Sequence, residues 1–242
     1  IPFFVLETNA LAGMANKLGV RLGGTGINAQ EGSGMPGEVL GIPVRPGLAE
    51  DPDGTKAAAA RQNWDLDEGR PTIVVTGGSQ GAVSINTAVA GALEDLCRDF
   101  QVLHAYGKKN TVPAEHEHYT AVPYIDDMAG ALAVADVMVC RSGAMTVAEV
   151  SAAGLPAIYV PLPHGNGEQA LNSRALVEAG AAVQIADAEL TPGRLVDEVR
   201  AILDHPDALS AMRAAADAST AGDAAAVIAD RIAHRVAADT RG

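Results

Sequence analysis

The sequence is poor in aromatic and basic residues, and each shortage argues against a class of function. Its 242 residues include three Phe, four Tyr and one Trp, too few for surfaces that stack bases or sugars on aromatic rings. Lys and Arg number 17 against 30 Asp and Glu, which gives a formal net charge of −13. Because such a charge repels phosphate backbones, we expect no nucleic-acid partner.

Cysteine and long apolar runs are also scarce. Cys97 and Cys140 lie in an apolar helical segment and an apolar strand segment, with no CxxC pair or Cys/His cluster, so we expect two buried, reduced thiols and no metal site. No run approaches the roughly 20 apolar residues of a membrane span, and the first residues show no basic segment followed by an apolar one. The chain begins without Met inside a strand-like run, residues 1–6, and we expect an upstream part to be missing.

From Pro71 onward, short β-rich runs alternate with segments of helical periodicity. This alternation is typical of βαβ units around a parallel sheet, and it predicts one doubly wound α/β domain. The predicted strands are 72–76, 101–105, 119–124, 137–140, 157–161 and 182–185. The predicted helices are 82–98, 127–133, 146–153, 168–179 and 191–204.

The remaining segments predict less regular structure. Residues 1–22 indicate one strand and one helix, 9–18, of a different unit, and 23–54 indicate loops and a linker because Gly and Pro are frequent there. After Asp204, an Ala-rich stretch predicts two helices, the last over 224–238. We therefore divide the chain into 1–45, a domain over 46–223 and a terminal helix over 224–242.

A glycine-rich turn follows the first strand of the predicted domain. Glycines at such a turn let main-chain N–H groups approach an anion, and the following helix start adds positive potential. The pattern matches neither GxxxxGK[ST] nor GxGxxG, and an ordinary tight turn remains the alternative. The candidate phosphate-loop residues are Gly77, Gly78, Ser79, Gln80 and Gly81.

Two further loops follow predicted strands, and we expect all three to face one cleft, since open α/β sheets bind ligands at the carboxyl ends of their strands. In the first, Glu149 is either the end of a Thr146-x-x-Glu149 capping box or an acceptor for ribose hydroxyls. In the second, His164, Gln169 and Asn172 are suited to sugar hydroxyls. Arg45, held near Pro43 and Pro46, is a candidate phosphate ligand at the domain junction.

The order of these motifs resembles the MurG family, the bacterial peptidoglycan N-acetylglucosaminyltransferases. The resemblance rests on Leu6-Glu7-x-Asn9-Ala10-x-Ala12-Gly13, Ile42-Pro43-Val44-Arg45, 77–82, Tyr124-Ile125-Asp126-Asp127-Met128, 141–149 and 164–172, and it covers essentially the whole chain. It implies the two-domain GT-B fold, with the complete C-terminal donor domain here and the end of an N-terminal domain before it. The last helix would cross back to that N-terminal domain.

The resemblance also implies a reaction and a set of site residues. GlcNAc would pass from UDP-GlcNAc to lipid I at the inner face of the cell membrane, with inversion and without a metal or other cofactor, to give lipid II. Ile125 would offer main-chain groups to uracil, Glu149 would accept ribose hydroxyls, and Gln169 would contact the sugar. The general base would lie in the missing N-terminal part. The implied donor-site positions are Asn9, Arg45, Ser79, Ile125, Ala144, Met145, Thr146, Val147, Ala148, Glu149 and Gln169.

Two alternatives remain open from the sequence. The chain could be a UDP-sugar-binding half that needs a separate partner chain. A nicotinamide oxidoreductase is less favoured, because GxGxxG is absent and the second strand is followed by His104-Ala105-Tyr106-Gly107 without the acidic residue that binds a ribose.

Overall fold

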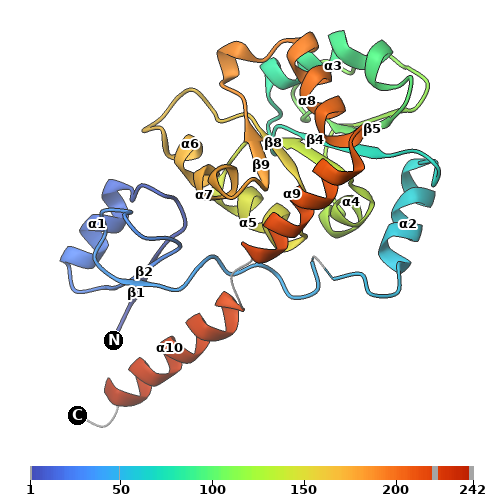
Figure 1. The fold of residues 1–242 in the computed structure, drawn as a ribbon. Helices are drawn as coiled ribbons and strands as arrows, with labels where there is room; N and C mark the ends of the chain where they lie inside the picture. The colour runs from blue at the N-terminus through green and yellow to red at the C-terminus, as the bar shows by residue number, and fades with distance from the viewer. Residues whose placement is uncertain (1, 49, 220–222, 240–242) are drawn as a thin grey trace.

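The computed structural model describes residues 2–48, 50–219 and 223–239 and contains two parallel sheets (Figure 1). The larger sheet has six strands in the order β6-β5-β4-β7-β8-β9. This confirms the predicted doubly wound α/β domain, because the order is that of a Rossmann-type sheet. Its strands are β4 (Thr72–Thr76), β5 (Gln101–Ala105), β6 (Tyr119–Val122), β7 (Val137–Cys140), β8 (Ala157–Tyr159) and β9 (Ala182–Gln184).

Helices cover both faces of this sheet and form two hydrophobic cores. One core packs α3 (Val83–Leu96) and α8 (Pro192–Leu203) against one face, together with part of α9 (Pro206–Ala218). The other core lies under α2 (Thr55–Trp64), α4 (Met128–Val134), α5 (Ala144–Ala152) and α7 (Arg174–Glu178). The strands from β4 to β6 follow one another toward one edge of the sheet, and those from β7 to β9 follow one another toward the other edge. The helices α3 and α5, which follow the neighbouring strands β4 and β7, therefore lie on opposite faces. Such a switch point opens a crevice at the strand ends.

The smaller sheet consists of β1 (Phe4–Glu7), β2 (Thr25–Asn28) and β3 (Glu38–Val39), all parallel. The strand β1 was predicted, but the prediction of loops and a linker over 23–54 missed β2 and β3, which lie within that segment. The helix α2, which begins directly after it, was not predicted either. Gly26 faces the main chain of Pro36, where a Cβ would approach the Pro36 carbonyl oxygen to 2.0 Å. Glycine is therefore required in this segment where β2 packs closely against the main chain, and not only where the chain turns.

The predicted helices differ in their bounds from the observed ones, most clearly in three places. The predicted helix 9–18 is α1 (Met14–Arg21), which begins later because the Glu7 carboxylate accepts the N–H groups of Asn9 and Gly13. The helix α5 begins at Ala144, two residues earlier than expected. The predicted helix 168–179 is divided at Ser173 into α6 (Glu168–Asn172) and α7, where the Ser173 hydroxyl donates to Gln184 of β9.

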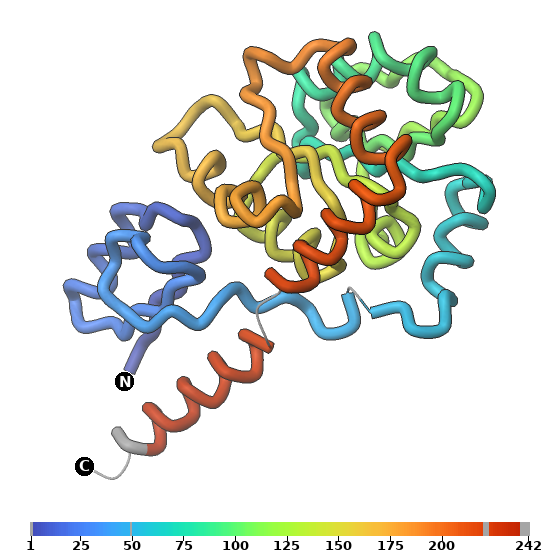
Figure 2. The backbone as a smooth tube through the Cα atoms, viewed as in Figure 1, coloured from blue at the N-terminus to red at the C-terminus, as the bar shows by residue number. Residues whose placement is uncertain are grey.

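The last helix, α10 (Ala224–Asp239), extends away from the large sheet (Figure 2). Arg231 of α10 pairs with Glu38 of β3 at 2.7 Å, so this helix contacts the smaller sheet. The contact is of the kind expected for a helix that crosses back. The domain limits 1–45, 46–223 and 224–242 remain predictions.

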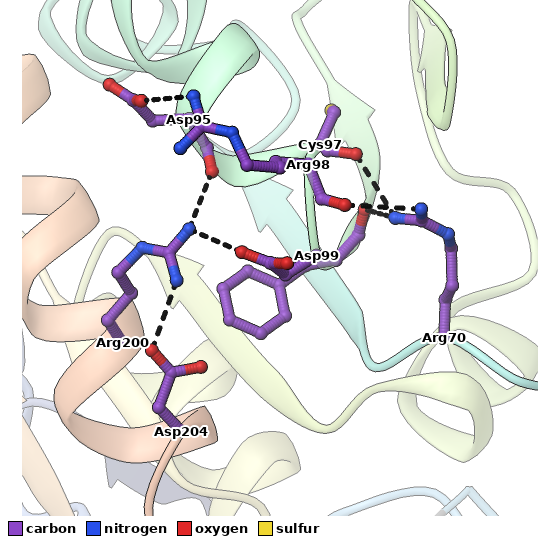
Figure 3. A network of polar contacts seen from close by, with 8 residues as sticks. Arg70, Asp95, Cys97, Arg98, Asp99, Arg200 and Asp204 are labelled. Carbon is purple, nitrogen blue, oxygen red and sulfur yellow. Dashed lines mark hydrogen bonds and ion pairs between the residues drawn. The ribbon is translucent and has the colours of Figure 1, made fainter.

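Polar contacts at the sheet end opposite the crevice hold α3 and α8 (Figure 3). Arg70 donates to the carbonyl oxygens of Cys97, Arg98 and Phe100 just after α3, where a helix leaves unpaired acceptors. Arg200 of α8 pairs with Asp99 at 2.7 Å.

Cys97 and Cys140 are free and buried, as predicted. None of the helices in the described ranges is long and apolar enough to span a membrane.

Candidate functional site

A cavity of about 480 Å³ opens at the switch point, where the segments after β4 and β7 meet the loop before α6. We name it the switch-point cavity. The three loops that the sequence singled out therefore meet at one site, as expected. Its walls are formed by Thr76, Gly77, Gly78, Ser79, Gln80, Gly81, Ala82, Val83, Arg141, Gly143, Thr146, Leu162 and Gln169.

The glycine-rich turn brings its main chain close to its neighbours. A Cβ on Gly77 would lie 2.3 Å from the Ala82 nitrogen, and one on Gly81, which has φ +72°, would lie 2.2 Å from the Tyr106 oxygen. Asn110 donates to the carbonyl oxygens of Gln80 and Tyr106 and fixes the turn against the segment after β5. Ser79 and Gln80 are exposed at the cavity. A side chain at Gly77 or Gly81 would therefore clash with the neighbouring main chain, and the turn would lose this conformation.

Two helices begin at this cavity without a side-chain cap. In α3 and α5 the N-caps are Ala82 and Gly143, neither of which accepts an N–H bond through its side chain. The early N–H groups of both helices are available to an anion, and the helix dipoles favour negative charge there. Thr146 is the third residue of α5, so the capping-box alternative for Thr146 and Glu149 is wrong.

A partly buried ion pair lies at one wall of the cavity, to which Arg141 contributes. Arg141 pairs with Asp187 and also donates to Ser84, whose hydroxyl donates to Asp187 at 2.6 Å. Burial acts to raise the pKa of Asp187, but hydrogen bonds from Ser84 and Arg141 and the Arg141 charge lower it below its usual value. The Asp187 carboxylate therefore stays ionised, and the pair holds the loop after β7 to the start of α3.

Gln169 lies opposite this wall with part of its amide free. Its Oε1 accepts from the Leu162 N–H at 3.1 Å, which leaves the amide NH₂ to donate into the cavity. His164 is exposed in the loop before α6 and is not among the residues that form the walls. Of the loop's polar groups, Gln169 has the better position to contact a ligand.

A second cavity, of about 510 Å³, lies between the 41–50 segment, α5, α7 and the start of α10. We name it the linker cavity. Arg45, Val147 and Ala148 contribute to its walls. Glu149 lies on the same helix, and burial raises the pKa of its carboxyl although the Arg45 charge acts in the opposite direction. The main-chain carbonyl of Glu149 accepts from the Ala153 N–H, but its carboxylate oxygens accept no hydrogen bond from another residue of the described ranges, so they are available to donors of a ligand.

The other implied positions lie around these cavities. Ala144 and Met145 form the first turn of α5, and Met145 is exposed. The Ile125 side chain is buried under β6 and α4, but no hydrogen bond within the described ranges uses its peptide groups. Asn9 lies after β1 and accepts from Asn172. Asn172, expected to suit sugar hydroxyls, is 8% exposed, borders the linker cavity and hydrogen-bonds to Ala10, Asn9 and the Ser142 carbonyl.

A buried polar chain supports the glycine-rich turn from below. Asn86 donates to the Tyr106 carbonyl and accepts from His104 Nε2 at 3.0 Å, while the Tyr119 hydroxyl donates to His104 Nδ1 at 2.7 Å. Burial lowers the pKa of His104 to about 4, so the imidazole is neutral at pH 7. We assign it a structural role beneath the segment that packs on Gly81.

Sequence reasoning missed several residues of the site. Asp187 and Ser84 complete the Arg141 pair, although they stand 46 and 57 positions from it. Asn110 and Asn86 position the turn through the segment after β5. No local motif marks these contacts, because each depends on strands that become neighbours only in the folded sheet.

The chain has relatives among known proteins. Residues 72–232 match the glycosyltransferase family 28 C-terminal domain. The chain is 64% identical over 234 residues to the UDP-N-acetylglucosamine--N-acetylmuramyl-(pentapeptide) pyrophosphoryl-undecaprenol N-acetylglucosamine transferase of Corynebacterium efficiens, covering 96% of this chain and 65% of that protein. The protein of the same name from Corynebacterium glutamicum strain R is 61% identical over 237 residues, with 98% and 67% covered. The chain thus spans about two thirds of these relatives' length.

Solved structures show the same fold. The MurG of Acinetobacter baumannii aligns with a TM-score of 0.74 at 25% identity and covers 97% of this chain and 67% of that one. The calicheamicin glycosyltransferase CalG4 aligns with a TM-score of 0.60 at 19% identity, with 88% and 54% covered, and supports the fold alone. The fold is of the GT-B type. The chain belongs to glycosyltransferase family 28 and, within it, to the MurG family.

Proposed function

We propose that this chain carries the donor site of an N-acetylglucosaminyltransferase of peptidoglycan synthesis. The reaction transfers GlcNAc from UDP-GlcNAc to lipid I, forms lipid II and inverts the anomeric carbon. The observation that carries the proposal is the single cavity at the sheet's switch point, where the glycine-rich turn and two uncapped helix starts converge. The names of the relatives with 61–64% identity supply the substrates.

The diphosphate of the donor occupies the switch-point cavity in this proposal. Within the turn, the Gly78 and Gly81 N–H groups are bonded to Thr76 and Gly78, so the Ser79 and Gln80 N–H groups, together with those of the first turn of α5, donate to its oxygens. The Ser79 hydroxyl adds a donor. As the bond to the sugar breaks, negative charge grows on the UDP leaving group. Donors already fixed in place stabilise this charge without reorganisation, which lowers the barrier.

The nucleoside and the sugar extend from the cavity in two directions. Glu149 accepts the two ribose hydroxyls beside Arg45, and the free peptide groups of Ile125 pair with uracil. On the other side, the Gln169 amide donates to an oxygen of GlcNAc. The acceptor and the group that deprotonates its hydroxyl belong, in this proposal, to the part of the relatives' length that this chain does not span.

We also propose that the protein binds peripherally to the cytoplasmic face of the membrane, where lipid I is present. Met14 and Leu18 of α1 and Leu22 directly after it are exposed, with exposed fractions of 87%, 55% and 72%, and Lys17 and Arg21 lie on the same side of the helix. An apolar stripe flanked by cations suits an anionic lipid surface. Sedimentation with phosphatidylglycerol vesicles tests this, and binding that a Lys17→Glu/Arg21→Glu variant retains in full would contradict it.

Calorimetric titration of UDP-GlcNAc into the chain tests the donor-site proposal. We expect saturable binding, and we expect Glu149→Ala to weaken UDP binding by about 1–3 kcal/mol because donors of the ribose lose a charged acceptor. NADH serves as the control ligand. Stronger binding of NADH than of UDP-GlcNAc would refute the proposal. If Glu149→Ala binds UDP unchanged, the assignment of Glu149 to the ribose is wrong.

A further inference from the structure

We infer that Lys108 and Lys109 attract the anionic donor toward the switch-point cavity and so speed its association, without contacting its diphosphate once it is bound. The inference rests on the proposed function, because the ligand that it concerns is UDP-GlcNAc. The two lysines come shortly after β5, at the carboxyl end of the large sheet. Both are exposed, and neither is among the residues that form the walls of the cavity.

The overall charge of the chain opposes the arrival of an anion. Its formal net charge is −13, and a negative field slows the approach of a diphosphate unless a local positive field offsets it. Lysine is rare in this sequence. The four lysines are Lys17, Lys56, Lys108 and Lys109. Two of the four therefore stand side by side at the end of the sheet that carries the proposed site.

The main chain holds these two lysines beside the glycine-rich turn. Gly107, which directly precedes Lys108, has φ +90°, and a Cβ there would lie 2.6 Å from the carbonyl oxygen of Gln80. Asn110, which directly follows Lys109, donates to the same carbonyl at 2.8 Å. The segment 107–110 is therefore fixed to the turn at both of its ends, with the lysines between them.

The Lys108 ammonium also lies beside the segment proposed to bind uracil. Its Nζ is 5.0 Å from the centroid of the Tyr124 ring, and Tyr124 directly precedes Ile125. A cation–π contact holds an ammonium in place without neutralising its charge. Neither Lys108 nor Lys109 forms an ion pair with a carboxylate of residues 2–48, 50–219 or 223–239. Both positive charges therefore remain available to act on an approaching anion.

The loop between β5 and β6 separates charges of opposite sign. Its exposed carboxylates, Glu115 and Glu117, flank His116. His116 bridges to Tyr119 at the start of β6, and its Nε2 lies 3.4 Å from Glu94 near the end of α3. Because β5 and β6 are parallel, the start of β6 lies at the end of the sheet opposite the cavity. The loop therefore places its lysines near the site and its glutamates far from it.

Two carboxylates lie at the same end of the sheet as the lysines. Asp127 accepts from the Gly130 N–H as the N-cap of α4, where the helix dipole favours its negative charge. Asp126 is exposed and has the opposite sign to the lysines. Removal of the Asp126 charge should therefore change the association rate in the opposite direction, which gives the test a second sign.

The test compares Lys108→Gln/Lys109→Gln with Arg98→Gln/Arg213→Gln in the full chain. Each double variant loses two positive charges, which changes the net charge from −13 to −15. The control arginines have exposed side-chain fractions of 59% and 42%. They lie at the opposite end of the sheet, because Arg98 directly follows α3 (Figure 3) and Arg213 pairs with Asp136 directly before β7.

Line shapes of the uracil proton signals during an NMR titration give the association and dissociation rate constants. At about 0.02 M ionic strength, where the Debye length is about 20 Å, the lysine variant should bind UDP-GlcNAc about threefold to tenfold more slowly. Its dissociation rate should stay within about twofold of wild type, and the arginine control should change the association rate by less than about twofold. At about 0.5 M salt the loss should shrink to less than about 1.5-fold.

The charge of the ligand and the sign of the substitution sharpen the test. Association of neutral uridine should be unaffected, whereas UDP should lose more than UDP-GlcNAc, because its terminal phosphate, with a second pKa of about 6, adds negative charge at neutral pH. Asp126→Asn should speed the association of both nucleotides.

Three results would overturn the inference: an equal loss in the arginine control, a loss that persists in high salt, or a loss confined to the dissociation rate. The last would make the lysines direct ligands of the bound nucleotide. If the wild-type chain binds none of the uridine ligands, the proposed function fails and the inference fails with it. Normal binding with unchanged association rates in the lysine variant overturns the inference alone.

Discussion

The two parallel sheets of this chain differ in how deeply their strands are buried. Every residue of β4, β5 and β7 is buried, because helices cover both faces of the large sheet. In the small sheet, Phe4, Val5 and Leu6 of β1 are only partly buried or exposed, and the neighbouring helix α1 buries no residue. The large sheet therefore has a large core of its own, whereas the small sheet buries few large apolar side chains, among them Ile27 of β2 and Met35.

The two sheets are therefore stabilised by different kinds of interaction. Apolar burial stabilises the large sheet, which positions the switch-point cavity. The small sheet relies on polar contacts, namely Glu7 with its loop, Asn172 with Asn9 and Ala10, and Arg231 with Glu38. Variants placed in each region should therefore affect different measurements.

The same Leu→Ala substitution should lower the free energy of unfolding much more in the large sheet than in the helix beside the small sheet. Leu103 on β5 is fully buried, whereas Leu18 on α1 is 55% exposed. Leu103→Ala should lower the free energy of unfolding by about 2–5 kcal/mol through lost burial and a cavity, and Leu18→Ala should change it by less than about 0.5 kcal/mol. Urea unfolding measures both. Similar losses at the two sites would show that the small sheet has a core of its own.

A second comparison uses two glycines in the walls of the switch-point cavity, Gly77 and Gly143. In Gly77→Ala the new methyl would lie 2.3 Å from the Ala82 nitrogen, but in Gly143→Ala its nearest neighbour is Thr146 Oγ1 at 3.9 Å. We expect Gly77→Ala to cost about 1–3 kcal/mol of stability and to abolish tight UDP binding, while Gly143→Ala folds normally. Thermal unfolding and UDP titration check this. A Gly77→Ala protein with normal UDP affinity would exclude a tight turn at the diphosphate.

The charged Glu149 carboxylate should lower the stability of the fold but strengthen UDP binding. Burial raises the pKa of its carboxyl, so the native state binds this proton more tightly than the unfolded state does. Stability is therefore lost as the pH rises from the unfolded pKa of about 4.3 through the raised native pKa. Glu149→Gln should then melt slightly higher than wild type at pH 7 but not at pH 3, and should bind UDP more weakly. A lower melting temperature at pH 7 would contradict this account.

The smallest effect is expected at α10. Arg231 and Glu38 are each about half exposed, and such ion pairs contribute between about 0 and 1 kcal/mol. Arg231→Ala should leave UDP binding unchanged and lower the melting temperature slightly, with a difference that shrinks in high salt. Arg235→Ala on the same helix, at a site for which no ion pair is described, is the matched control. A large loss only in Arg231→Ala would make α10 a principal contact of the small sheet.

The large sheet could be predicted from the sequence because its strands are runs of buried β-branched residues. The runs at Ile73-Val74-Val75 and Val137-Met138-Val139 are buried on both faces and carry no polar alternation, and their bounds were predicted correctly. Strand β2 reads Thr25-Gly26-Ile27-Asn28 and β3 has two residues. These segments become strands only through their neighbours, and no local pattern indicates them.

The candidate site was predictable to a similar, partial extent. The glycine-rich turn and the loop after β7 could be read from the sequence, since each follows a strand directly. The partners that fix them, Asp187 for Arg141 and Asn110 for Gln80, come from remote segments. Asn172 was identified as a polar group, but its position between the sheets depends on Ala10, 162 residues away. Spacing along the chain carries no information on such contacts.

The central claim is that the switch-point cavity holds the diphosphate of a uridine nucleotide. The most direct test is calorimetric titration of UDP and of uridine into wild type and Ser79→Ala. The account predicts that Ser79→Ala weakens UDP by about 1 kcal/mol or more and leaves uridine nearly unaffected. Equal losses for the two ligands, or no loss for UDP, would contradict it.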